Sequence, residues 1–239
     1  TVTPKLAAVL AGRGSKSLTI AIESGSERMR RVVNKKLSGE EIEAAARHAK
    51  QGGLKALKLY GMVGLPCEDN DDVESTAALL LSLKKGTPGL RFTLGVSTFV
   101  PKAHTPFQWQ GVRPEAEKRL KLLAKRLKPK GIDLRPESYG WSVIQALLSR
   151  SDRRLAPVIA AVRGSQESLG GWKKAYRAAL AGELPEARSA GVVLPLPPSW
   201  ESVVHDEWAS DAVLPWGHLD GPLSQEKLQE HRQEALNLG

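Results

Sequence analysis

Polar and turn-forming residues follow three apolar, strand-like segments, and they are the part of the sequence best suited to bind a ligand. They are Glu23-Ser24-Gly25, the turn from Gly64 to Glu68, and the run from Ser97 to Pro101. The carboxyl ends of parallel strands lie side by side, and ligands of α/β proteins bind there. Glycine lets a ligand approach the backbone, and a strand-end carboxylate suits ribose hydroxyls or an amino group. The residues predict a small-molecule or cofactor site without specifying its chemistry.

Other kinds of site have weaker support. Cys67 is the only cysteine, which excludes an internal disulfide framework and a metal cluster built from this chain alone. No activating partner for the thiol is evident, so Cys67 is expected to be a neutral loop residue rather than a nucleophile. The five histidines lack close ligand spacing such as His-x-x-x-His. The acids Asp69 to Asp72 begin a helix, where they suit the helix dipole as caps rather than metal ligands.

The elements that must position the three segments alternate between strands and helices. Strands are predicted at Ser17–Ile22, from Leu54 to the turn at Gly64, at Arg91–Val100 and, more weakly, at Ile132–Leu134. Helices are predicted from Glu27, across Ile42–Ala49, after Asp69 and after Pro114. Helical segments between successive strands fit right-handed crossovers. The first part of the chain is therefore predicted to be α/β with a parallel sheet.

Two helix starts show capping-box spacing: Ser24 with Glu27, and Ser38 with Glu41. Helix capping and ligand binding are about equally good explanations of the serines after the first strand. Glu23 is harder to explain by capping. An acid at the end of a buried strand is costly unless it is paired or faces a ligand.

Short helices dominate beyond about residue 140. They are predicted at Trp141–Arg150, Arg154–Arg163 and Trp172–Leu180, before a Pro-rich linker at Leu194–Pro198 and a last helical run at Ser224–Leu238. Most tryptophans are expected to be packing residues. We predict two domains, residues 1–139 with the sheet and residues 140–239 as a mainly helical extension.

Composition limits the classes of partner. The apolar fraction of 41% is ordinary for a globular protein, no apolar run is long enough to cross a bilayer, and a cytoplasmic location is expected. The net charge of +9 favours encounter with anionic partners. Seven basic residues follow Pro114, from Lys118 to Lys130. A solvated helix face explains them better than a nucleic-acid patch, which would usually add stacking aromatic residues.

The order and spacing of several motifs resemble the radical SAM superfamily, and in particular its members with an amino-terminal B12-binding-type domain. The superfamily motifs are Ile22 to Arg28, Asn34-Lys35, Lys58 to Asp69 and Asp72-Val73. Those of the subgroup are Val96 to Lys102, His104 to Trp109, Asp152-Arg153-Arg154, Gly171-Trp172 and Pro215 to Asp220. The resemblance spans nearly the whole chain.

This resemblance implies a partial parallel (βα) barrel, formed by the last strands of a (βα)6 barrel. In the family, a 4Fe-4S cluster on a CxxxCxxC motif binds S-adenosylmethionine and cleaves it reductively to a 5′-deoxyadenosyl radical. That motif is absent from the 239 residues and is expected upstream of Thr1. The chain is thus expected to be the carboxyl-terminal half of an enzyme, inactive alone. Bound cobalamin would require an upstream domain.

The resemblance also implies which residues contact S-adenosylmethionine. Glu23 and Ser24 correspond to the fourth-strand region near the ribose or methionyl part. The fifth-strand motif near adenine corresponds to Gly64, Leu65, Pro66 and Glu68. Val100 and Pro101 correspond to the loop after the sixth strand, which also approaches adenine. Cys67 is not expected to be a cluster ligand.

Two further functions stay open. One is RNA modification, because the strand-end motifs are shared with tRNA methylthiotransferases and the chain is basic. The other is a cluster-free binding or scaffold module that keeps the half-barrel. Such a module would expose one side of an unclosed sheet. An upstream reading frame with CxxxCxxC would exclude the scaffold, whereas a start codon directly before Thr1 would exclude the fragment.

Overall fold

The structure is a computed structural model that describes residues 2–163, 167–184 and 199–239. The chain forms two compact units, each assembled from separate stretches of sequence. The first unit comprises Thr1–Phe99, Glu115–Glu137 and Gln233–Gly239, and the second comprises Val100–Pro114 and Ser138–Arg232. The domain boundary after residue 139 stays a prediction, and the Pro-rich linker at Leu194–Pro198 lies outside the described residues.

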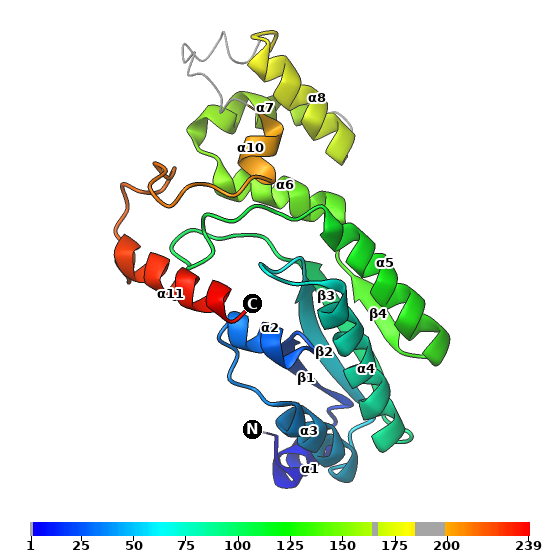
Figure 1. Cartoon of the computed structure of the whole chain (residues 1–239). Coiled ribbons are helices and arrows are strands. Elements are labelled where there is room, and N and C mark those ends of the chain that lie inside the picture. Colours follow the sequence, from blue (N-terminus) through cyan, green and yellow to red (C-terminus); the bar gives the residue numbers. More distant parts are fainter. Residues whose placement is uncertain (1, 164–166, 185–198) are drawn as a thin grey trace. The chain divides into compact units, whose positions relative to one another are not determined.

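A four-stranded parallel sheet organises the first unit (Figure 1). Its strands follow the order of the sequence: β1 (Ser17–Glu23), β2 (Ala56–Val63), β3 (Arg91–Thr98) and β4 (Asp133–Pro136). All three strand pairs are parallel, with Leu59 opposite both Ile20 and Leu94. The fold class is therefore α/β, as predicted, with a sheet consistent with a partial parallel (βα) barrel and a helical extension.

Helices connect the strands of the first unit. They are α2 (Glu27–Val32) and α3 (Gly39–Gln51) after β1, α4 (Asn70–Gly86) after β2, and α5 (Glu115–Leu127) with the short η1 (Lys128–Lys130) before β4. The capping box of Ser38 and Glu41 is confirmed, because each side chain accepts a hydrogen bond from the other residue's backbone N–H. The predicted box of Ser24 and Glu27 is wrong. Ser26 caps α2 instead, accepting a hydrogen bond from Met29 N.

The segment before β1 also folds as a helix, α1 (Pro4–Gly12), which the sequence pattern did not indicate. Thr3 caps it by accepting a hydrogen bond from Leu6 N at 3.2 Å. The helix packs on α3, where a Cβ at Gly52 would lie 2.4 Å from that of Ala7.

The two faces of the sheet differ in burial. Leu57, Leu59 and Leu94 are fully buried on the face against which α3, α4 and α5 pack. Alternate residues point to the opposite face, where Lys58 and Tyr60 are exposed. The first unit therefore has one closed sheet face, which forms its core, and one open face.

The second unit is helical in its described part. Its helices include α6 (Tyr139–Arg150), η2 (Arg153–Leu155), α7 (Ala156–Val162), α8 (Leu169–Leu180) and α10 (Trp200–Val204), and α11 (Gln225–Asn237) begins in this unit. Trp172, Tyr176 and Trp200 are buried in its main apolar cluster, together with Val112 from the segment before α5. Among the described helices, none is long and apolar enough to cross a membrane.

Candidate functional site

Glu23 lies at the end of β1, where the strand departs from regular geometry. The pairing of β1 with β2 shifts between Ala21 and Glu23, and Glu23 has a φ of 63°. A positive φ is uncommon outside glycine and persists where the surrounding structure fixes it. Lys35 Nζ lies 3.2 Å from Glu23 Oε1, so the acid is paired. Its side chain still lines a cavity and is available to a second partner.

Ser24 is buried, and its hydroxyl forms contacts within the protein. Ser24 Oγ accepts a hydrogen bond from Ser26 N at 3.1 Å and lies 3.4 Å from Thr76 Oγ1. Gly25 N donates to the same threonine hydroxyl at 2.9 Å. Ser24 therefore helps to tie the β1–α2 loop to α4, and its contact with a ligand stays a prediction.

The turn after β2 carries the next four predicted site residues. Gly64 has a φ of 79°, and a Cβ there would lie 2.9 Å from the Cβ of Ala116. A larger residue at position 64 would be strained by the positive φ and would also overlap Ala116. Leu65 and Pro66 are buried. Glu68 Oε2 accepts a hydrogen bond from Gly64 N at 2.6 Å, so this carboxylate braces the turn from inside the protein. Contact between Glu68 and a ligand stays a prediction.

Val100 and Pro101 belong to the second unit. Val100 packs against its apolar cluster, and Pro101 O accepts a hydrogen bond from Ser149 Oγ at 3.3 Å. Their role at a cofactor stays a prediction.

We define the strand-end edge as Glu23, Gly64 and Thr98, at the carboxyl ends of β1, β2 and β3. Val63 and Thr98 are opposite each other in the sheet, and Glu23 is opposite Gly61. Thr98 is buried, and its Oγ1 has no hydrogen-bond partner among the described residues. The hydroxyl is enclosed by the protein and does not line the cavity described next.

A cavity of about 250 Å³ lies on the open face of the sheet. We call it the sheet-face cavity; it is lined by Glu23, Lys58, Leu59, Tyr60, Gly61, Met62, Thr93, Gly95, Val96, Ser97, Arg135 and Glu137. The ring of Tyr60 covers Gly95, where a Cβ would lie 2.5 Å from Tyr60 Cε1. The sequence analysis missed this face, although Lys58 and Tyr60 of β2 and Thr93 and Ser97 of β3 stand at alternate positions that indicate it.

An acid at the start of α4 holds the neighbouring loops together. Asp72 Oδ1 accepts a hydrogen bond from Ser26 Oγ at 2.6 Å, and Oδ2 accepts from Asp69 N at 3.0 Å and pairs with Arg28. Burial acts to raise the pKa of Asp72, but the hydrogen bonds and the Arg28 guanidinium outweigh it and lower the pKa below its ordinary value. The interpretation of these acids as helix caps is consistent with this geometry.

Asp72→Asn should therefore destabilise the protein by about 2 kcal/mol at pH 7. Because the folded-state pKa is depressed, the ionised carboxylate contributes stability above its ordinary pKa, near 4, and loses it as the pH falls through the folded pKa. The difference from wild type in urea unfolding should thus shrink below pH 4. The exposed Asp71, changed to asparagine, is the matched control. A difference that stays constant from pH 7 to pH 3 would contradict this role.

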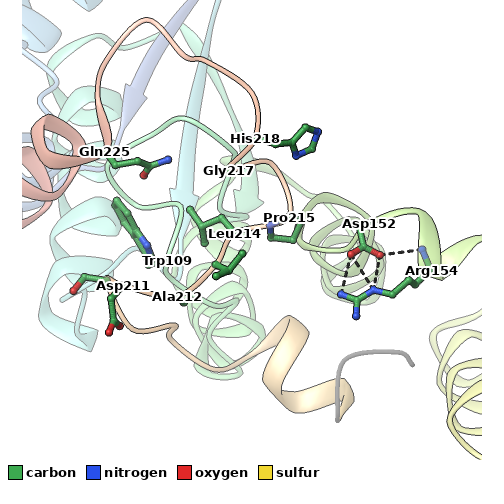
Figure 2. A pocket seen from close by; sticks show the side chains of 12 residues that line it. Trp109, Asp152, Arg154, Asp211, Ala212, Leu214, Pro215, Gly217, His218 and Gln225 are labelled. Atoms are coloured by element: carbon green, nitrogen blue, oxygen red, sulfur yellow. Dashed lines mark hydrogen bonds and ion pairs between the residues drawn. The ribbon is translucent and has the colours of Figure 1, made fainter. Parts of the chain in front are cut away.

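The second unit contains a larger pocket of about 610 Å³ (Figure 2). Asp152 and Arg154 form its polar wall, with Arg154 Nε 2.9 Å from Asp152 Oδ1. Leu214 and Pro215 are part of the loop opposite them, and Trp109 also lines the pocket. The motifs Asp152-Arg153-Arg154 and Pro215 to Asp220 therefore meet in space. Sequence reasoning used these motifs only for the resemblance and did not predict a pocket.

The residues of the first unit fit S-adenosylmethionine but not an iron–sulfur cluster. Glu23, which lines the sheet-face cavity, carries a carboxylate that suits ribose hydroxyls or an amino group, and the exposed ring of Tyr60 in the same lining suits an adenosyl group. A cluster needs several cysteine ligands, and the sequence contains one, Cys67. Within the described residues, no group of three or more His, Cys, Asp or Glu side chains is placed to hold a metal ion.

A scan of protein-family models finds one match in the first unit. Residues 1–80 match the model of the Radical SAM superfamily, which supports the resemblance inferred from the motifs. The matched segment contains β1, β2 and the turn from Gly64 to Glu68. A match to this superfamily suggests an enzyme, and the superfamily implies S-adenosylmethionine and usually a 4Fe-4S cluster.

The chain is also similar to one curated protein, an uncharacterized protein of Methanocaldococcus jannaschii. The two are 35% identical over 141 residues, which cover 59% of this chain and 31% of the relative. The chain thus matches about a third of the length of that relative. The activity, substrate and partners of a whole protein are therefore matters for proposal.

Proposed function

We propose that the first unit is the S-adenosylmethionine-binding part of a radical SAM enzyme, formed by the last strands of its barrel. The observation that carries this proposal is the position of Glu23, whose carboxylate lies at the strand-end edge and also lines the sheet-face cavity. The family match over residues 1–80 supports the same cofactor. The cluster, bound by residues outside this sequence, would supply the electron for reductive cleavage.

The residues of this chain would bind and orient the cofactor. Glu23, already beside Lys35, can accept hydrogen bonds from ribose hydroxyls or from the methionyl ammonium group. The exposed ring of Tyr60 can cover an adenosyl group on the open face and keep water from it.

Glu23→Gln should weaken the binding of S-adenosylmethionine to this chain about tenfold, since a charge-assisted hydrogen bond becomes a neutral one. Affinity is measured from the shifts of backbone amide resonances during titration with the cofactor. The control is Glu27→Gln, an exposed carboxylate four residues further on that pairs with Arg31. Equal affinity of wild type and Glu23→Gln for S-adenosylmethionine would show that Glu23 does not contact the cofactor.

The longer protein offers the test of the proposed reaction. Reconstituted anaerobically with iron and sulfide, it should show cluster absorbance and form 5′-deoxyadenosine from S-adenosylmethionine. Cluster absorbance without cleavage of the cofactor would contradict the proposed reaction. Its substrate class is open, and a B12-binding domain and cobalamin stay proposals that rest on the sequence motifs alone.

RNA modification is the alternative enzyme, and the basic helix α5 gives it little additional support. Arg119 is buried against Glu68, while Arg126 and Lys121 pair with Glu74 and Glu117. Several of the seven basic residues are thus neutralised within the first unit. A cluster-free scaffold module differs from both enzymes in one measurable property, because it is expected not to bind S-adenosylmethionine.

A further inference from the structure

A buried ion pair joins the turn after β2 to helix α5. Arg119 Nη1 lies 2.8 Å from Glu68 Oε2, and Arg119 Nη2 donates to Glu68 O at 2.6 Å. Only 8% of the Arg119 side chain and 2% of the Glu68 side chain are exposed. Both the charge and the backbone of Glu68 are therefore held by one guanidinium from a helix about fifty residues further along the chain.

The same carboxylate oxygen fixes the other end of the turn. Glu68 Oε2 accepts a hydrogen bond from Gly64 N at 2.6 Å. Three residues before Arg119, Ala116 contacts Gly64, where a Cβ would lie 2.9 Å from the alanine Cβ. Helix α5 thus contacts the turn at both ends, once through an ion pair and once through close packing.

We infer that Arg119 is a positioning residue, which acts through Glu68 to hold the backbone from Gly64 to Glu68 in the conformation that a ligand meets at the strand-end edge. The ligand part of this inference rests on the proposed function. The Gly64 amide points inward to Glu68, so it holds the conformation of the turn and does not contact the ligand itself. Without the guanidinium, a buried carboxylate would lose its counter-charge and pull away toward water.

Protonation of Glu68 changes the contribution of Arg119. Burial raises the pKa of Glu68 to about 7, against the opposing effects of the Gly64 N–H and Arg119, and Asp72 on α4 raises it further. Above that pH the carboxylate is charged and holds both donors. Below it the group takes up a proton, and the contribution of Arg119 decreases because Glu68 no longer carries a negative charge, while burial itself favours the neutral carboxyl.

Hydrogen exchange of the Gly64 amide directly measures how firmly its hydrogen bond to Glu68 is held. At pH 8, Arg119→Met should lower the protection factor of this amide at least tenfold, and Arg119→Lys should restore part of it. Arg126→Met on the same helix breaks only an exposed pair and should leave the protection unchanged. A folded Arg119→Met protein with wild-type protection at Gly64 would overturn the inference.

A second readout is needed if Arg119→Met does not fold. Because Glu68 binds its proton more tightly in the folded turn than in water, acidification of wild type does not test the pair, and Arg119→Lys is used instead. Its Gly64 protection factor at pH 8 should lie below that of wild type, because one ammonium group cannot reproduce both guanidinium contacts to Glu68. Wild-type protection in a folded Arg119→Lys protein would refute the role of the charged pair.

Cofactor binding separates this inference from the proposed function. Arg119→Met or Arg119→Lys should bind S-adenosylmethionine at least fivefold more weakly than wild type at pH 8, and the deficit should narrow at pH 6. If wild type binds no cofactor, the proposed function fails, while the Gly64 protection factors still decide the role of Arg119. If wild type and the variants bind equally, the ligand part of the inference fails.

Discussion

Gly25→Ala should destabilise the first unit by about 3 kcal/mol, at the upper end of the cost of overpacking. A Cβ at this position would lie 2.3 Å from Thr76 Cα and 2.9 Å from Thr76 N. Both atoms are backbone of α4, so no side-chain rotation can relieve the overlap. The loop after β1 would have to move away from α4 and lose the hydrogen bond from Gly25 N to Thr76 Oγ1.

Gly86→Ala is the matched control, because Gly86 ends the same helix α4 and nothing lies within 4 Å of its would-be Cβ. We expect a change within about 0.5 kcal/mol there. Urea unfolding followed by far-UV circular dichroism gives both values. All six tryptophans lie in the second unit, so their fluorescence reports on that unit separately. Equal stability of Gly25→Ala and Gly86→Ala would show that the close approach to α4 is not structurally important.

Arg30→Met should cost about 3 kcal/mol, because it leaves several buried carbonyl groups without a donor. Arg30 Nη1 donates to Ser24 O and to Gly25 O, each at 3.0 Å, and Arg30 Nε donates to Leu37 O at 2.7 Å. Its side chain is buried on α2, and burial lowers the pKa of the guanidinium, which stays charged at neutral pH. The residue therefore holds together the loops on either side of α2, including the loop that follows Glu23.

Arg31→Met, one residue further along α2, provides the comparison. Arg31 is two-thirds exposed and pairs with Glu27 on its own helix, so its removal should change stability by less than about 0.5 kcal/mol. Arg30→Lys should recover only part of the loss, since one ammonium group cannot reach three carbonyls in the geometry of a planar guanidinium. Equal costs for Arg30→Met and Arg31→Met, measured by urea unfolding, would contradict the role of Arg30.

Local sequence pattern was sufficient for the sheet and most of the helices. The β-branched and apolar runs at Ser17–Ile22 and Arg91–Val100 coincide with β1 and β3, and the weak segment Ile132–Leu134 overlaps β4. These predictions depend on period and turn residues, which are local properties. The short helices α1 and α10 were missed, because each is brief and stabilised by packing rather than by a long amphipathic repeat.

The roles of individual charged side chains depend on tertiary contacts and were not predictable in the same way. Arg119 looked like one of seven solvent-facing basic residues, yet it is buried against Glu68. One signal was present in the sequence: Arg119 lies three residues after Ala116 and four before Leu123, on the apolar stripe of α5. The spacing of Ser24 and Glu27 predicted a capping box, but Ser26 caps α2 and Ser24 lies beside Thr76 of α4.

The second unit is assembled from two separate stretches of sequence, and this has a consequence for its synthesis on the ribosome. Val112 N donates to Val204 O at 2.8 Å, and a Cβ at Gly111 would lie 2.0 Å from His205 O. These contacts join residues about ninety positions apart, and the elements translated between them include β4 and helices α5 to α8. At bacterial elongation rates, the earlier segment waits roughly 5–20 s for its partner to be made. Nascent chains arrested before residue 200 should therefore expose the 100–114 segment to proteases and chaperones, although the strands on both sides of it are already complete.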